Sequence, residues 1–180
     1  MAEKKKGIRI VIVVEDSMME RFCREALLKL GYHKREIRPE RAPRGKGSGK
    51  QWVDKLIVIE VMALRRKRHQ TLAVLVGSDV DEMTLDDRVL KLKTSLQEAG
   101  VKDRRDDERI AYWLPKWSIE TWLKRLNGED VDEDTRYKHQ VKSPEYKAIA
   151  ESFIQHYRKG DPLGLSSLEF AFTETPRIEN

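Results

Sequence analysis

Three short apolar runs, 8–14, 72–76 and 110–114, alternate along the chain with stretches whose apolar residues have helical spacing. Short runs bounded by turns predict strands buried on both faces. The run 8–14 is rich in β-branched residues and predicts a central strand. A more polar segment, 35–41, contains Pro39 and predicts a short edge strand.

Apolar residues three and four positions apart predict helices between these strands and after the last one. Asp16 or Ser17 is placed to cap the first helix, and Gly31 is placed to end it. The tail 175–180 is expected to be frayed. The predicted helices cover 17–30, 51–68, 85–99, a segment between Ser118 and Gly128, 144–157 and 165–172.

The alternation of strands and helices predicts an α/β fold with a compact, mostly parallel sheet of about four strands, covered by helices on both faces. We expect this α/β domain to span 1–126. Residues 127–180 would form a helical C-terminal extension packed on the same domain. The length of 180 residues is sufficient for one domain with a substantial core.

The composition narrows the function classes only modestly. The chain has 36 Lys and Arg against 31 Asp and Glu, and this net charge of +5 permits an anionic partner such as nucleic acid. The single cysteine, Cys23, excludes an intramolecular disulfide and a Cys-rich zinc site, and its helical position predicts a buried thiol. No apolar run approaches the ~18–20 residues that cross a bilayer, and no signal peptide is recognised, so we expect a cytoplasmic location.

A Gly-rich basic loop, 41–50, resembles a phosphate-binding loop at first sight. The Walker pattern requires Gly-Lys-Ser/Thr after Gly and four further residues, and the loop does not satisfy it. The remaining interpretations are a solvated loop and a surface that contacts a phosphate backbone. The candidate nucleic-acid contacts are Arg44, Lys46, Lys50, Arg66 and Arg68.

Acidic side chains follow two of the predicted strands. Asp79 and Asp81 come after the strand 72–76, and Glu15 comes after the strand 8–14. Parallel strands end at one edge of a sheet, and carboxylate oxygens are the ligands that Mg²⁺ prefers. The sequence therefore predicts that these three acids meet and bind Mg²⁺ or Mn²⁺. The alternative is that Asp79 and Asp81 only cap the turn before the next helix.

The spacing of these acids resembles the Toprim domain of topoisomerases, primases and nucleases of the overcoming-lysogenization-defect class. That family has a Glu after its first strand and Asp-x-Asp after a later one, which match Glu15, Asp79 and Asp81. The segment 13–22 resembles the small stand-alone Toprim-like proteins of prokaryotic defence loci, with a second acid at Glu20. The chain has Asp16 where the family usually has Gly.

A second segment of the chain resembles the same small proteins. They carry Pro-x-x-x-Ile-Glu-x-Trp after the last strand, and residues 115–122 match this pattern, which makes Glu120 a further candidate acid. Alternatively, Glu120 only complements the helix dipole. Trp113, Trp117 and Trp122 are candidates for base stacking or, more simply, for core packing.

The resemblance implies a metal-dependent phosphodiester hydrolase that acts on DNA or RNA. Glu15, Asp79 and Asp81 would hold the metal, with Glu20 or Glu120 assisting catalysis. Prokaryotic defence with a partner ATPase is the implied context, and oligomerisation stays open. The rival interpretation is a non-catalytic Toprim-like subunit whose acidic site holds a structural or regulatory cation.

Overall fold

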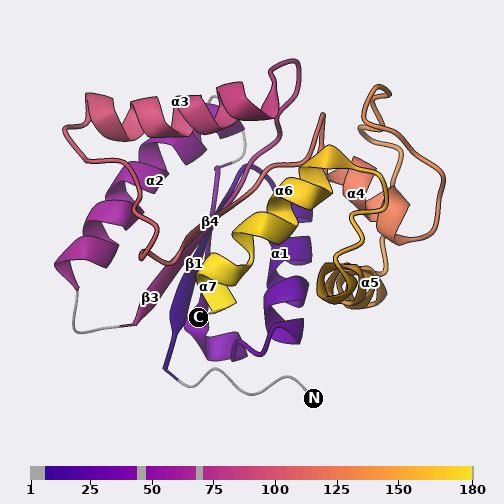
Figure 1. Cartoon of the computed structure of the whole chain (residues 1–180), viewed down its shortest axis with the longest axis horizontal. Coiled ribbons are helices and arrows are strands. Elements are labelled where there is room, and N and C mark those ends of the chain that lie inside the picture. The colour runs from indigo at the N-terminus through magenta and orange to yellow at the C-terminus, as the bar shows by residue number, and fades with distance from the viewer. Residues whose placement is uncertain (1–6, 44–47, 68–70, 180) are drawn as a thin grey trace.

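A four-stranded parallel sheet forms the centre of the molecule in the computed structural model, which describes residues 7–43, 48–67 and 71–179 (Figure 1). The strands are β1 (Arg9–Val14), β2 (Ile37–Arg41), β3 (Leu72–Gly77) and β4 (Ile110–Trp113). Their order in the sheet is β2-β1-β3-β4, and every neighbouring pair is parallel. The predicted parallel sheet, its central first strand and its edge strand are confirmed.

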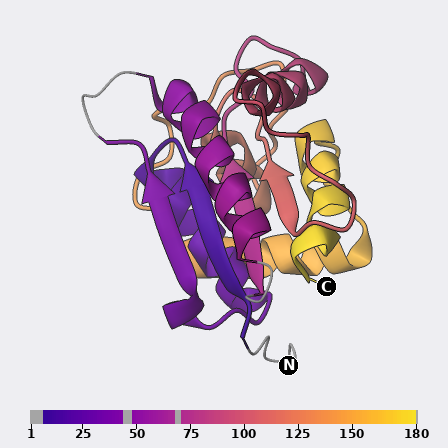
Figure 2. The same cartoon turned by 90° about the vertical axis from the view of Figure 1, so that its left-hand side faces the viewer.

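Helices cover both faces of this sheet and complete a three-layer α/β sandwich (Figures 1 and 2). One face carries α2 (Gly49–Arg66) and α3 (Leu85–Glu98). The opposite face carries α1 and the helices that follow β4. These are α1 (Ser17–Lys29), α4 (Ile119–Leu126), α5 (Tyr146–Lys159), α6 (Ser166–Glu174) and α7 (Pro176–Glu179), and a short 3₁₀ helix, η1 (Lys34–Glu36), precedes β2.

The sequence of β1 explains why two core clusters form. Ile10, Ile12 and Val14 belong to the cluster beneath α1, whereas Val11 and Val13 belong to the cluster beneath α2. Successive side chains of a strand point to opposite faces, so a strand covered on both sides must be apolar throughout. The continuous apolar runs in the sequence follow from this arrangement.

Tight packing at the end of β3 brings the first helix close to the sheet. A Cβ added at Gly77 would lie 2.9 Å from Cγ of Met19 in α1, so the position requires glycine. The aromatic rings of Phe22, Trp113, Trp122 and Phe153 pack together beneath α1. Core packing is therefore confirmed for Trp113 and Trp122, and Cys23 is buried as predicted. Trp117 is only half-buried.

The C-terminal segment differs from the sequence prediction at its end. The expected frayed tail is wrong, because α7 forms and Ile178 is fully buried. The indole N–H of Trp113 donates to the hydroxyl of Thr175 at 3.2 Å, and the amide of Tyr112 donates to Glu174 at 2.9 Å. These contacts fasten α6 and its end to β4. None of the helices in the described ranges has the length and apolar character needed to cross a membrane.

Candidate metal centre

Two turns meet at the carboxyl edge of the sheet. Val14 and Gly77, the last residues of β1 and β3, lie opposite each other in the strand pairing. The residues that follow them, Glu15 and Ser78, therefore emerge side by side. The carboxylate of Asp16 accepts hydrogen bonds from the amides of Met18 and Met19 and so caps α1 as predicted.

Glu15 is tied to the turn after β3 through one of its carboxyl oxygens. Oε1 accepts a hydrogen bond from the hydroxyl of Ser78 and another from the amide of Asp79, at 3.0 Å. The start of α2 also lies against Glu15, since a Cβ added at Gly49 would be 3.1 Å from Cβ of Glu15. Burial raises the pKa of Glu15, and this effect exceeds the opposing effects of Ser78, of the Arg88 and Lys50 charges and of the Asp79 amide.

Asp79 is the most deeply buried of the three predicted ligands, with 6% of its surface exposed. In the described part of the chain, its carboxyl group has no hydrogen-bond or ion-pair partner. Burial raises the pKa of Asp79 well above its usual range. The negative charges of four neighbouring acids raise this pKa further, in the order Glu15, Asp16, Asp81 and Glu120. The structure therefore brings the predicted acids Glu15, Asp79 and Asp81 into one electrostatic cluster, together with Glu120.

A lysine from α2 partly balances the charge of this cluster. The ammonium of Lys50 lies 2.5 Å from a carboxylate oxygen of Asp81 and 3.4 Å from the carbonyl oxygen of Val80. Asp81 has a left-handed backbone, with φ of 55°. Lys116 donates to the carbonyl oxygens of Asp81 and Met83, each at 2.7 Å, and so holds this turn in place.

The two additional acids lie in different surroundings. Glu120 is buried in the first turn of α4 and accepts a hydrogen bond from the amide of His139 at 3.0 Å. Glu120 also lies close enough to Asp79 for its charge to raise the pKa of Asp79. Glu20 instead pairs with Arg41 at 3.0 Å and is not among the four acids whose charges chiefly raise the pKa of Asp79. The structure thus brings Glu120 within electrostatic reach of Asp79, whereas Glu20 is paired with Arg41.

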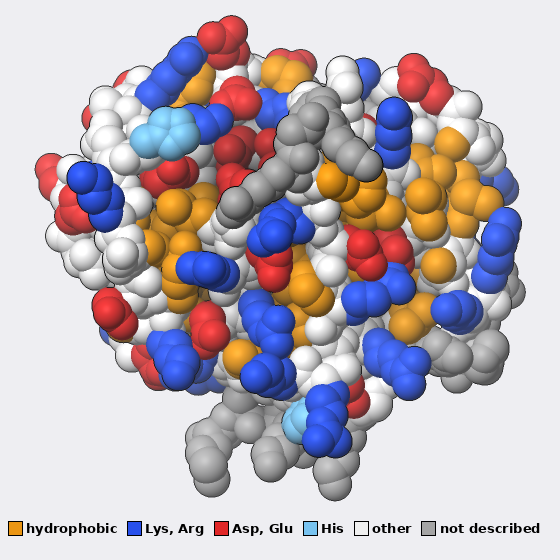
Figure 3. Space-filling model, turned by 180° about the vertical axis from the view of Figure 1, so that it is seen from behind, with side chains coloured by type: hydrophobic (Ala, Val, Ile, Leu, Met, Phe, Trp, Pro, Cys, Tyr) orange, Lys and Arg blue, Asp and Glu red, His pale blue; other side chains and the backbone are white. Residues whose placement is uncertain are grey.

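The candidate nucleic-acid contacts also separate. Lys50 lies among the acids, whereas Arg66 lies in the last turn of α2, at the opposite edge of the sheet. Arg44, Lys46 and Arg68 lie outside the described residues. Among the described residues on the face drawn in Figure 3, Lys and Arg side chains are interspersed with Asp and Glu side chains.

Sequence reasoning missed Arg88 and Asp54, which are linked to Glu15 through Ser78. Arg88 of α3 is 1% exposed; its Nε donates to Oγ of Ser78 at 2.9 Å, and its Nη1 lies 2.7 Å from Asp54. A signal was present, because Arg88 shares one face of α3 with the buried Leu92 and Leu96. Arginine is rarely buried without a partner, so its place on this apolar face indicated a buried ion pair.

The chemistry of the donors fits a divalent cation, although their arrangement is open. Within the described ranges, no three His, Cys, Asp or Glu side chains form a ready-made metal cage. Asp79 nevertheless combines deep burial with four neighbouring negative charges, and a bound cation would relieve both penalties. A hard cation that retains several waters needs only a few protein oxygens. A small cavity of about 170 Å³ beside the cluster is lined by Glu15, Asp16, Arg41, Gly49 and their neighbours.

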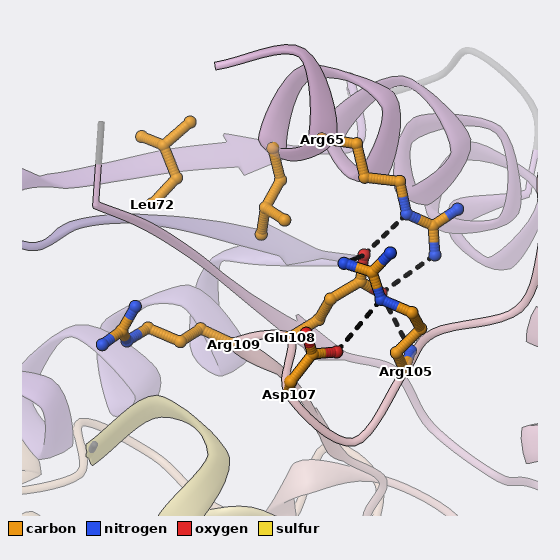
Figure 4. A pocket seen from close by; sticks show the side chains of 7 residues that line it. Arg65, Leu72, Arg105, Asp107, Glu108 and Arg109 are labelled. Atoms are coloured by element: carbon orange, nitrogen blue, oxygen red, sulfur yellow. Dashed lines mark hydrogen bonds and ion pairs between the residues drawn. The ribbon is translucent and has the colours of Figure 1, made fainter. Parts of the chain in front are cut away.

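A larger cavity, of about 560 Å³, lies away from this chemistry at the amino edge of β3 and β4 (Figure 4). Its lining includes Arg65 and Arg105, which both pair with the buried Glu108. Burial opposes ionisation of Glu108, but the hydrogen bonds and charges of these partners outweigh it and lower its pKa. Arg65, Arg105 and Glu108 therefore form an ion-pair cluster that joins α2 to the segment before β4.

Comparison of the chain with models of protein families, with curated proteins and with solved structures found no match.

Proposed function

We propose that this protein is a Mg²⁺-dependent phosphodiester hydrolase that acts on nucleic acid. The observation that supports this function is Asp79, whose pKa is raised first by its burial and then by the charges of four other acids at the carboxyl edge of the sheet. Charge of one sign is rarely concentrated in this way without a cation to neutralise it. The edge at which these acids lie is also where open α/β sheets bind their ligands.

Glu15, Asp79 and Asp81 would hold the metal. The bound cation would polarise a phosphoryl oxygen and lower the pKa of a coordinated water. Glu120 is the acid best placed to assist proton transfer, since it is the additional candidate that lies near Asp79. Lys50 reaches the same site from α2 and would contact the phosphate backbone without reading sequence.

The Toprim resemblance supports the same proposal through the positions of Glu15, Asp79 and Asp81. It also supports a role in prokaryotic defence beside a partner ATPase.

The rival function is a non-catalytic subunit whose acidic site holds a structural or regulatory cation. The ion pair between Lys50 and Asp81 favours this rival over a hydrolase that uses two metal ions, because it engages one of the three proposed ligands. The absence of a three-ligand cage in the described ranges favours it on the same ground, because two metal ions need more ligands than one. A nucleotidyl transferase would require nucleotide-binding features that the sequence does not show.

Cleavage assays distinguish the two functions. The purified chain would be incubated with single- and double-stranded DNA and RNA in Mg²⁺, Mn²⁺ or EDTA. We expect metal-dependent cleavage by the wild type and none by the Asp79→Asn/Asp81→Asn double variant. An Asp107→Asn variant is the matched control, because Asp107 is exposed at the opposite edge. Equal cleavage by the wild type and the double variant would rule out this active site, and metal binding without cleavage of any substrate would support the rival.

A further inference from the structure

A chain of polar contacts links the surface of α2 to Glu15 through the interior of the protein. Asp54 in α2 pairs with Nη1 of Arg88 in α3 at 2.7 Å, and Nε of Arg88 donates to Oγ of Ser78 at 2.9 Å. Ser78 then donates to Oε1 of Glu15. Arg88 and Ser78 are 1% and 0% exposed, so water does not compete for these contacts.

The direction of these hydrogen bonds is fixed by the arginine. A guanidinium group only donates, so the oxygen of Ser78 must accept from Arg88. The single proton of the Ser78 hydroxyl is then available for Glu15. Oε1 of Glu15 accepts this proton and also the amide hydrogen of Asp79. Two donors therefore occupy the same oxygen of Glu15 and leave its other oxygen without a hydrogen bond from the described residues.

We propose that Arg88, acting through Ser78, is a positioning residue. It keeps Oε1 of Glu15 hydrogen-bonded within the protein, so that Oε2 is the oxygen that binds the metal. This inference rests on the proposed metal site and assigns the atom with which Glu15 contributes to it. Groups that orient metal ligands typically change metal affinity by about 10–100-fold when they are removed. Arg88 touches neither metal nor substrate in this arrangement, and it acts only through the hydroxyl of Ser78.

Binding of Mn²⁺ tests the role of Arg88 without depending on activity. Titration calorimetry would compare the wild type with Arg88→Met and Ser78→Ala, and we expect each variant to bind Mn²⁺ about 10–100-fold more weakly. Because the two residues act through one contact, the Arg88→Met/Ser78→Ala double variant should lose no more Mn²⁺ affinity than whichever single variant binds Mn²⁺ more weakly. Ser78→Ala removes one oxygen atom, so it keeps the test informative if Arg88→Met does not fold.

Arg65→Met is the matched control for general destabilisation. Arg65 also pairs with a buried carboxylate, Glu108, but it lies at the opposite edge of the sheet. We expect this variant to bind Mn²⁺ within about twofold of the wild type, although it unfolds more easily. Unchanged affinity in Arg88→Met and Ser78→Ala, or equal losses in Arg65→Met, would overturn the positioning role and leave the metal site standing. A wild type that binds no Mn²⁺ would overturn the metal site itself.

Discussion

Asp79 has an unusual environment for an ionisable residue, and its effect on stability depends on pH. Its pKa is raised in the folded protein, mainly by burial and then by neighbouring acids. As the pH rises above the usual range of aspartate, the unfolded chain loses this proton before the folded chain does. The folded state therefore loses stability until the pH passes the raised pKa. Each pKa unit of difference corresponds to about 1.4 kcal/mol.

Asp79→Asn should remove much of this pH dependence. In EDTA, we expect the variant to be more stable than the wild type at neutral pH and to show a flatter profile between acidic and neutral pH. Glu15, whose pKa is also raised, should retain a smaller dependence of the same sign. Urea unfolding at a series of pH values measures the effect, with Asp107→Asn as the exposed control. Parallel profiles for wild type and Asp79→Asn would contradict the burial of this charge.

Lys50 would compete with a bound cation for the carboxylate of Asp81. Its ammonium pairs with Asp81, and both side chains are partly exposed. An ion pair of this exposure contributes up to about 1 kcal/mol, so Lys50→Met should bind Mn²⁺ up to roughly fivefold more tightly. Calorimetry would measure this gain, and Lys55→Met on the same helix should leave the affinity unchanged. Weaker binding by Lys50→Met would show that the lysine supports the metal instead of competing with it.

At the scale of elements, hydrophobic patterns were sufficient to predict β1, β3, β4 and the α-helices up to α6, whereas the polar edge strand β2 was recognised by its Pro39. Strands β1, β3 and β4 are buried on both faces, so their sequences form apolar runs that are distinct from the helical stripes. Glu15 and Asp79 come together because of the same topology, since each follows the carboxyl end of a parallel strand. Asp54, Arg88 and Ser78 could not be joined from sequence, because their contact depends on how α2 and α3 lie on the sheet.

The terminal helix α7 shows where local patterns fail. The segment 175–180 contains a single large apolar residue, Ile178, and such a short polar segment has little helical tendency of its own. Tertiary contacts determine its structure instead. Ile178 is fully buried, and its carbonyl oxygen accepts a hydrogen bond from the hydroxyl of Tyr32. The tail is therefore part of the core beneath the sheet.

Ile178→Ala tests this docking. Truncation of a fully buried isoleucine costs about 2–5 kcal/mol, so we expect a loss of this size in the free energy of unfolding. Ile59→Ala is the matched control, because Ile59 is 58% exposed and its truncation should change stability by no more than about 0.5 kcal/mol. Urea denaturation measures both variants. Similar losses at the two positions would show that α7 does not pack as described.

At the scale of the whole molecule, the two edges of the sheet differ in how a buried carboxylate is surrounded. At the amino edge, Glu108 is neutralised by Arg65 and Arg105, and its pKa is lowered. At the carboxyl edge, Asp79 lies among acids and its pKa is raised. In the first arrangement the buried carboxylate is already paired, whereas the second carries a penalty that a cation would remove. This contrast within one fold indicates that the carboxyl edge serves function more than stability.

Metal binding at the carboxyl edge should therefore stabilise the whole chain. A ligand present at 100 times its dissociation constant stabilises the folded state by about 2.7 kcal/mol. In a protein of this size, that corresponds to an increase in Tm of roughly 5–10 °C. We expect Mg²⁺ or Mn²⁺ to produce such a shift relative to EDTA in scanning calorimetry.

The Asp79→Asn/Asp81→Asn variant separates specific binding from a general salt effect. It removes two of the three proposed ligands and leaves the rest of the surface unchanged, so its Tm should be the same in Mg²⁺ and in EDTA. Asp107→Asn should keep the full shift, because that carboxylate lies at the other edge. If the double variant were stabilised as much as the wild type, the cation would bind elsewhere. The raised pKa of Asp79 would then reflect its burial and the neighbouring acids, without a role in metal binding.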